Sequence, residues 1–308
     1  MQKSTEESGS LAEIHRDDKV TYLIIGLFWG LHLLPFLAFF TGVTKGAILC
    51  CVVLYFVRMF GITGGYHRYF SHKSYSMGRV MQFLMAWLAQ TSFQRGVLWW
   101  AAHHRDHHAH SDREGDPHSP ILDTFLHAHV FWLWADGADE PTARVRDLER
   151  FPELVWLDKN WLVPPVALAV SVFGFFTWYG GSITAGFSGL LIGFFLSTVF
   201  TWHGTFLVNS VAHLWGTRPY QTKDMSRNNL LIAILTLGEG WHNNHHYYMN
   251  SVRQGFRWWQ IDITYYILRL MSFVGLVSDL KMPPKEVVYD QTAAAIAARS
   301  AAVPEAAE

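Results

Sequence analysis

Four long apolar runs, arranged as two pairs, dominate the sequence. The runs of the first pair cover about residues 20–40 and 47–66, and those of the second cover about 161–179 and 183–208. Each is close to the ~20 residues that an α-helix needs to cross ~30 Å of hydrocarbon. Short glycine-containing turns join the runs within each pair. The pattern predicts two transmembrane helical hairpins, in preference to helical pairs buried inside a soluble core.

Two further apolar stretches are predicted to lie along the membrane surface. Val80–Trp100 is long enough to cross, but it contains three glutamines and Arg95. Crossing would also put the histidines before it and those after it on opposite sides of the membrane. Trp258–Val277 contains Asp262 and Arg269. We therefore expect each stretch to form a helix in or near the interface.

The distribution of Lys and Arg predicts the orientation. Residues 67–160 contain ten of them and residues 214–285 contain eight, whereas the short turns within the pairs contain only Lys45. The positive-inside rule puts both long stretches, both termini and any site on these stretches in the cytoplasm. Residues 1–19 and 281–308 are polar or alanine-rich, and we expect loosely ordered tails there. Residues 1–19 have no apolar core behind a basic start, so they are not a cleavable signal.

The composition agrees with a membrane protein and excludes some partners. The chain of 308 residues is 50% hydrophobic and 16% charged, with 14 Trp and 22 Phe, whereas soluble domains carry roughly 25% charged residues. A net charge of −1 gives no overall field that would attract nucleic acid. The two cysteines, Cys50 and Cys51, are adjacent in an apolar run, so there is no disulfide framework.

Three histidine clusters carry the candidate chemistry. They are His67-Arg-Tyr-Phe-Ser-His72, His104-Arg-Asp-His107-His108 and His242-Asn-Asn-His245-His246. Positions i, i+3 and i+4 share one face of a helix, so the three imidazoles of each His-x-x-His-His cluster should project together. Imidazole is the commonest transition-metal ligand. Eight histidines exceed what one six-coordinate metal can use, so the clusters predict a two-metal site.

The other polar residues near these clusters are less decisive. His67 and His72 are roughly 140° apart on an ideal α-helix, so they meet only if the helix ends or bends between them. Asn209 and His213 are four residues apart at the cytoplasmic end of the fourth run, and we expect them at the site. Four nearby carboxylates could accept the second imidazole N–H, and the sequence does not choose among them: Asp106, Asp112, Asp116 and Glu239. The remaining histidines are expected to be non-ligands: His15, His32, His103, His110, His118, His127, His129 and His203.

The ligand set favours redox iron over hydrolytic zinc. Zinc hydrolases usually use three protein ligands and an open position, and no His-Glu-x-x-His pattern occurs. Imidazole-ligated iron with open positions can bind and reduce O2. Because the site would lie beside the bilayer, a lipid is the natural substrate.

Longer motifs around the histidines resemble those of one enzyme family. The stretches Asn209-Ser-Val-Ala-His213-Leu-Trp-Gly-Thr-Arg-Pro-Tyr220 and Gly238-Glu-Gly-Trp-His242-Asn-Asn-His245-His246, with the other two clusters, resemble the membrane fatty-acid desaturases. The similarity is to the acyl-CoA, stearoyl-type Δ9 branch and its bacterial relatives. It covers about Val20–Leu280, the predicted desaturase domain (20–280).

The resemblance implies a fold and a set of ligands. The fold is all-α, with four transmembrane helices under a cytosolic helical cap. Asn209 matches the position that reaches one metal through water. Two irons are bound by nine histidines: His67, His72, His104, His107, His108, His213, His242, His245 and His246.

The resemblance also implies an activity and its partners. Reduced iron would activate O2 to form a cis double bond, at carbon nine, in a saturated 16- or 18-carbon chain. No His-Pro-Gly-Gly haem signature occurs, so the electron donor would be a separate ferredoxin or b-type cytochrome supplied by an NAD(P)H reductase. Asn-Asn within the third cluster and Trp241 before it suggest a bacterial protein, hence a bacterial inner membrane.

One departure from the family pattern leaves the acyl carrier open. The basic residue expected at position 102 is Ala102, and Arg95 stands where the animal enzymes have asparagine. The carrier could be CoA or a phospholipid.

Two other functions remain open. A related di-iron hydroxylase of alkanes or lipids would share the histidine clusters but insert oxygen. A non-enzymatic metal carrier or channel should line its spans with polar ligands, whereas the predicted spans carry few ionisable groups.

Overall fold

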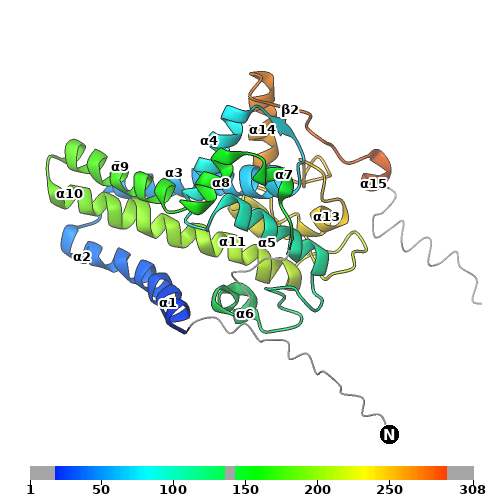
Figure 1. The fold of residues 1–308 in the computed structure, drawn as a ribbon, viewed down its shortest axis with the longest axis horizontal. Coiled ribbons are helices and arrows are strands. Elements are labelled where there is room, and N and C mark those ends of the chain that lie inside the picture. The colour runs from blue at the N-terminus through cyan, green and yellow to red at the C-terminus, as the bar shows by residue number, and fades with distance from the viewer. Residues whose placement is uncertain (1–17, 136–142, 290–308) are drawn as a thin grey trace, which may run out of the picture.

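A bundle of long helices forms one end of the molecule, and shorter helices form a cap at the other (Figure 1). The computed structural model describes residues 18–135 and 143–289. The bundle consists of α1 (Asp18–Leu33), η1 (Leu34–Leu37), α2 (Ala38–Thr41), α3 (Lys45–Phe60), η2 (Gly61–Ser71), α9 (Val163–Gly180), α10 (Ile183–Ser188), η4 (Gly189–Leu196) and α11 (Ser197–Leu214).

The cap is built from short elements. These are β1 (Ser76–Met77), α4 (Arg79–Gln90), α5 (Val97–His110), α6 (Phe125–His129), η3 (Phe131–Trp134), α7 (Arg146–Glu149), α8 (Pro152–Lys159), α12 (Leu230–Leu235), α13 (His242–Tyr247), α14 (Ile263–Phe273), β2 (Val277–Ser278) and α15 (Lys285–Tyr289). The two strands pair antiparallel, with Ser76 opposite Ser278.

Three helices of the described chain are long and apolar enough to cross a membrane: Lys45–Ser71, Val163–Gly180 and Ile183–Leu214. They coincide with the second, third and fourth apolar runs. The first run is helical as well, but its described apolar part, Ile25–Thr41, is shorter. The narrower 3₁₀ segment η1 interrupts it at Pro35, which lacks a backbone N–H. The fourth span therefore stays a prediction.

A buried arginine connects two of these long helices. Arg58 on α3 is fully buried and donates hydrogen bonds to Thr198 Oγ1 (2.7 Å) and to Ser197 Oγ on α11. Its Nε donates to the carbonyl of Leu54, one turn earlier (3.1 Å). A charge inside a membrane-spanning bundle is costly unless its donors are satisfied. The hydroxyl-rich start of α11 supplies these acceptors and thereby fixes α3 against α11.

Two expectations for the cap need correction. Val80–Trp100 is not one helix, because α4 ends at Gln90, α5 begins at Val97, and Phe93 and Arg95 between them have positive φ. The predicted C-terminal tail is also partly packed. Its helix α15 has a buried Val288, whose carbonyl accepts a hydrogen bond from the Tyr220 hydroxyl (3.0 Å). Residues 1–17 of the predicted N-terminal tail lie outside the described residues, and its last two residues begin α1.

The interfacial positions predicted for these stretches are not tested by the fold. In the second stretch, the helix is confined to α14, Ile263–Phe273. Leu270, Phe273 and Val274 expose 66–71% of their surface on one side of it. Such an apolar face is typical of a helix that lies in a membrane interface, so the prediction remains.

The N-terminus of α5 is capped by a carboxylate from another helix. Asp158 Oδ1, on α8, accepts hydrogen bonds from the backbone N–H groups of Leu98 (2.8 Å) and Trp99 (3.1 Å). A Cβ at Gly96 would collide with this carboxylate, 2.1 Å away. The cap fixes where α5 begins, and α5 carries three of the clustered histidines.

We expect Asp158→Ala to destabilise the protein by about 1–2 kcal/mol, because two buried N–H groups lose their acceptor. Asp158→Asn keeps an acceptor oxygen and should lose much less. Thermal unfolding in detergent compares the two variants with the unchanged chain. Equal midpoints for all three would show that the cap contributes nothing to stability.

Candidate metal centre

A widened helical turn brings His67 and His72 together. Residues 61–71 form the π-helix η2, and the backbone N–H of His72 donates to the carbonyl of His67, an i→i+5 bond of 3.2 Å. A π-helix places residues i and i+5 above one another. The two rings have centroids 4.9 Å apart. The wider turn of the π-helix is thus what brings the two imidazole rings together.

The two His-x-x-His-His helices each contribute to two separate groups of imidazoles. On α5, His104 and His108 turn to one group and His107 to the other. On α13, His245 belongs to the first group, and His242 and His246 belong to the second. The expectation that all three imidazoles of one cluster project together is therefore wrong. Residues i and i+4 stay together, and residue i+3 diverges enough to serve the neighbouring group.

The first group contains five histidines, and we call it the five-histidine group: His67, His72, His104, His108 and His245. One ring nitrogen of each lies within 4.8 Å of those of the others. The Nε2 atoms of His72 and His104 are 2.9 Å apart, and those of His67 and His245 are 3.0 Å apart. With metal–nitrogen bonds of about 2.1 Å, neighbouring donors of an octahedral metal are about 3.0 Å apart. The spacing fits one shared metal ion.

The second group, the four-histidine group, contains His107, His213, His242 and His246, all buried. The Nε2 atoms of His213 and His242 are 3.0 Å apart. His246 Nε2 is buried and has no hydrogen-bond partner among the described residues. The two groups are adjacent, since the rings of His108 and His246 have centroids 4.4 Å apart. The arrangement provides two neighbouring metal positions.

Burial keeps several of these imidazoles in the form that binds metals. Burial lowers the pKa of His104, His108, His242 and His245 well below the usual histidine value, and the neighbouring histidines lower it further. Neutral imidazoles present lone pairs, which is the state that a metal requires. The donor set therefore fits two metal ions.

Four carboxylates orient the rings from outside. Hydrogen-bonded contacts join His107 Nδ1 to Asp116 (3.0 Å), His213 Nδ1 to Asp112 (2.8 Å) and His246 Nδ1 to Asp224 (2.8 Å). Glu239 contacts His67 Nδ1 in the same way. A carboxylate that accepts a hydrogen bond from Nδ1–H keeps the proton on Nδ1, which leaves Nε2 free to bind a metal.

These contacts decide among the carboxylates that the sequence left open. Asp112, Asp116 and Glu239 take this role. Asp106 instead accepts a hydrogen bond from the backbone of Ala143 (3.0 Å). Asp224 was missed by the sequence analysis, because it lies in a loop 22 residues before its partner. Burial would raise the pKa of Asp224, but the hydrogen bond from His246 holds it well below its usual range.

Most histidines that were predicted to be non-ligands lie outside both groups. Three of them form a separate chain of contacts: His32 Nε2 to His203 Nε2 and His203 Nδ1 to His129 Nε2 are both 3.0 Å. His118 contacts Asp116 at 3.6 Å and belongs with His107 and Asp116 to a third set that could hold a metal. His15 lies outside the described residues.

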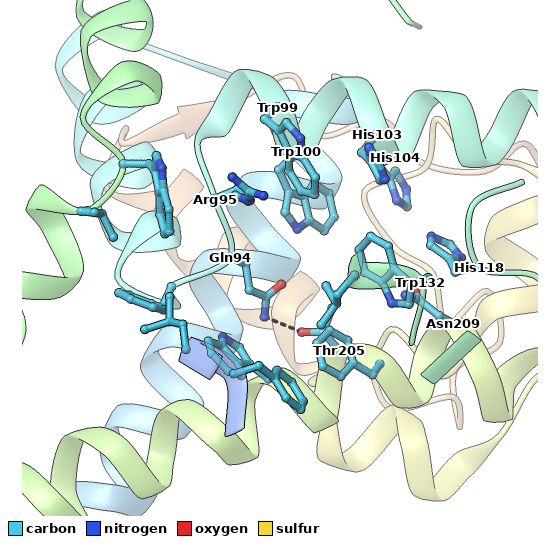
Figure 2. Close-up of a pocket in the computed structure, with 18 residues that line it drawn as sticks. Gln94, Arg95, Trp99, Trp100, His103, His104, His118, Trp132, Thr205 and Asn209 are labelled. Atoms are coloured by element: carbon cyan, nitrogen blue, oxygen red, sulfur yellow. Dashed lines mark hydrogen bonds between the residues drawn. The ribbon is translucent and has the colours of Figure 1, made fainter. Parts of the chain in front are cut away.

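An apolar cavity reaches the five-histidine group (Figure 2). Its volume is about 400 Å³, and His104 is part of its wall. Asn209, the one predicted site residue outside both groups, also lines it. Eight of the residues in its wall are phenylalanine or tryptophan: Phe28, Phe93, Trp99, Trp100, Trp132, Trp161, Trp202 and Phe206. Such a cavity suits an apolar ligand of ordinary size.

Two polar contacts mark the cavity. Gln94 Nε2 donates to Thr205 Oγ1 (3.0 Å), which links the loop before α5 to α11 (Figure 2). The Arg95 guanidinium lies 5.5 Å from the ring centroid of Trp99 and 5.7 Å from that of Trp161. Among the described residues that line the cavity, Arg95 is the one lysine or arginine.

Comparison with known proteins identifies the family. Residues 45–272 match the model of the fatty acid desaturase family. The chain belongs to this family. Its members are oxidoreductases, and the matched region includes all nine clustered histidines and most of the cavity wall.

Plant desaturases are among its relatives. The chain is 36% identical to an acyl-CoA C20 Δ5-desaturase of Anemone leveillei, over 82% of this chain and 80% of the relative. It is also 36% identical to the Δ9 acyl-lipid desaturase 2 of Arabidopsis thaliana, over 86% and 84%. A palmitoyl-monogalactosyldiacylglycerol Δ7 desaturase of the same plant is again 36% identical, over 82% and 67%. Relatives with three different bond positions do not determine the position in this chain.

We expect Asp224→Asn to weaken metal binding by roughly 10–100-fold, because a neutral amide accepts a hydrogen bond from His246 Nδ1–H more weakly than a carboxylate and can turn its NH2 toward the ring, which favours the wrong tautomer. Asp123→Asn is the matched control, since Asp123 is half-exposed and 3.7 Å from His127, outside both groups. Metal retention against a competing chelator measures the difference. Equal retention by both variants would contradict the role of Asp224.

Proposed function

We propose that this protein is an O2-dependent desaturase with a di-iron centre. The observation that carries the proposal is that His104 belongs both to the five-histidine group and to the wall of the apolar cavity. An acyl chain in the cavity would therefore lie next to the metal position. Family membership supports the reaction class, and the two groups of closely spaced imidazoles support two metals.

Nine histidines would hold the irons, five in one group and four in the other. Five imidazoles exceed the four ligands that zinc usually takes, whereas iron accepts six. Asn209 lies in the cavity wall and could reach the metals through water. When bound, the irons would supply the redox chemistry that reduces O2. Overall, one O2, two electrons, two protons and the two hydrogens removed from the acyl chain give two waters and a cis double bond.

The protein's own residues bind the acyl chain and exclude water. The ring of Trp100 is stacked on His104, with centroids 5.0 Å apart, and both rings line the cavity. The Gln94–Thr205 hydrogen bond restrains the wall formed by the loop before α5 against the wall formed by α11. Fixed walls restrict which methylene groups can approach His104. Bond position should therefore be counted from the carboxyl end, which stays near the polar cap.

We also propose the arrangement in the membrane. Four spans, with α1–α2 as the first, would put the cap and both termini in the cytoplasm, as the Lys and Arg distribution indicates. Electrons would come from a separate ferredoxin or b-type cytochrome supplied by an NAD(P)H reductase. A bacterial inner membrane remains the predicted location. For the bond itself we propose position Δ9.

We expect the purified protein to contain two irons per chain and His107→Ala to lose most of this iron and at least 100-fold in turnover. His110→Ala is the matched control. His110 is on the same helix, but its Nδ1 contacts the carbonyl of Asp106 (3.0 Å), and it belongs to neither group. Iron analysis and product formation are measured on both variants. Unchanged iron in His107→Ala would refute the ligand assignment.

Saturated acids of 14, 16 and 18 carbons, fed to cells that express the chain, should each yield a cis Δ9 product. Mass spectrometry and bond location identify the products. A fixed distance from the methyl end would contradict counting from the carboxyl end, and a constant position other than nine would contradict Δ9 alone. The alternative function, a di-iron hydroxylase, predicts a gain of one oxygen instead of the loss of two hydrogens.

A further inference from the structure

The apolar cavity reaches the outer surface of the bundle at two leucines. Leu27 and Leu162 line the cavity and are each 45% exposed, whereas the other described lining residues are buried or half-buried. An exposed leucine is common by itself. Two exposed leucines that also belong to the cavity wall mark where this wall meets the surface of the bundle.

Both leucines lie on surfaces that suit hydrocarbon. Leu27 is on the apolar helix Ile25–Thr41. Leu162 directly precedes the candidate span Val163–Gly180, near Val166, which is 53% exposed. In the proposed topology, α9 begins at the cytoplasmic side of the membrane, so Leu162 is level with the inner leaflet. The exposed edge of the cavity therefore faces lipid.

We propose that the acyl chain enters the cavity sideways from the bilayer, past Leu27 and Leu162, while it is still esterified to a membrane glycerolipid. This inference rests on the proposed function and resolves the choice between CoA and lipid as carrier. The ester groups of a glycerolipid lie at the interface, so its acyl chain reaches the cavity without leaving the apolar phase. An apolar edge offers no polar ligands to the large charged carrier of a CoA thioester.

Arg95 does not distinguish the two carriers. It lies in the cavity wall against Trp99 and Trp161, where it can attract a phosphate. Both a phospholipid headgroup and CoA carry phosphates. The distinction therefore depends on the exposed leucines, and the experiment must compare the two carriers directly.

Photo-crosslinking tests the route without requiring turnover. The full chain with iron is placed in nanodiscs containing phosphatidylglycerol with a diazirine in the middle of one palmitoyl chain. A parallel sample contains the same labelled chain as a CoA thioester, in nanodiscs of unlabelled ether lipid. We expect the lipid probe to label peptides that contain cavity residues such as Trp99 and Trp202 severalfold more than the CoA probe does.

Bulkier side chains at the edge should block this labelling. Leu27→Trp and Leu162→Trp should reduce cavity labelling by the lipid probe severalfold. Leu33→Trp is the matched control, since Leu33 is also on α1 and is 63% exposed but does not line the cavity. No labelling of the cavity by the lipid, or labelling that Leu27→Trp and Leu162→Trp leave unchanged, would overturn the inference.

Activity on the two carriers separates this inference from the proposed function. Dipalmitoyl phosphatidylglycerol should be desaturated, and palmitoyl-CoA in ether-lipid vesicles should not. Desaturation of the CoA thioester alone would overturn lipid entry but leave the desaturase proposal intact. Blockable labelling by the lipid without desaturation of either carrier would support lipid entry and contradict the proposed function.

Discussion

The structure depends on nine imidazoles, seven of them buried and two half-buried, whose ring nitrogens gather in two groups. Neutral imidazoles that face one another at 2.9–3.0 Å can satisfy only some of their lone pairs with N–H donors. Protonation does not remove the problem, because burial and the neighbouring rings both oppose a positive charge. A metal cation held by each group of histidines would accept these lone pairs. This demand explains why segments far apart in sequence meet at one place.

The surrounding elements serve this arrangement. The π-helical η2 turns His67 and His72 to the same side, the remote cap from Asp158 fixes the start of α5, and α11 delivers His213 from the bundle. The carboxylates act from outside by fixing the Nδ1 side of four rings. Their number matters, because each restrains one ring that would otherwise rotate. Trp100 and His104 both line the cavity. An apolar substrate in the cavity would therefore meet the five-histidine group at His104.

Sequence patterns predicted which histidines meet, but they did not predict that these histidines divide into two groups. The His-x-x-His-His spacings and the family resemblance identified the nine histidines that meet. Spacing could not show that His107 and His245 would join different groups from their neighbours, because that depends on how the histidine rings of α5 meet those of α13. Asp224 could not be found, since no local pattern relates it to His246. The break between α4 and α5 falls in the polar segment Gln90–Gly96, which could have signalled it, but the start of α5 is fixed by Asp158, about sixty residues away, which no local pattern shows.

The central claim is that each histidine group holds one iron. Anomalous X-ray diffraction from crystals of the iron-loaded protein, measured on both sides of the iron absorption edge, tests it most directly. We predict two peaks that vanish below the edge, one among the nitrogens of His72, His104 and His245 and one among those of His213, His242 and His246. A single peak, or peaks that persist below the iron edge, would contradict the account.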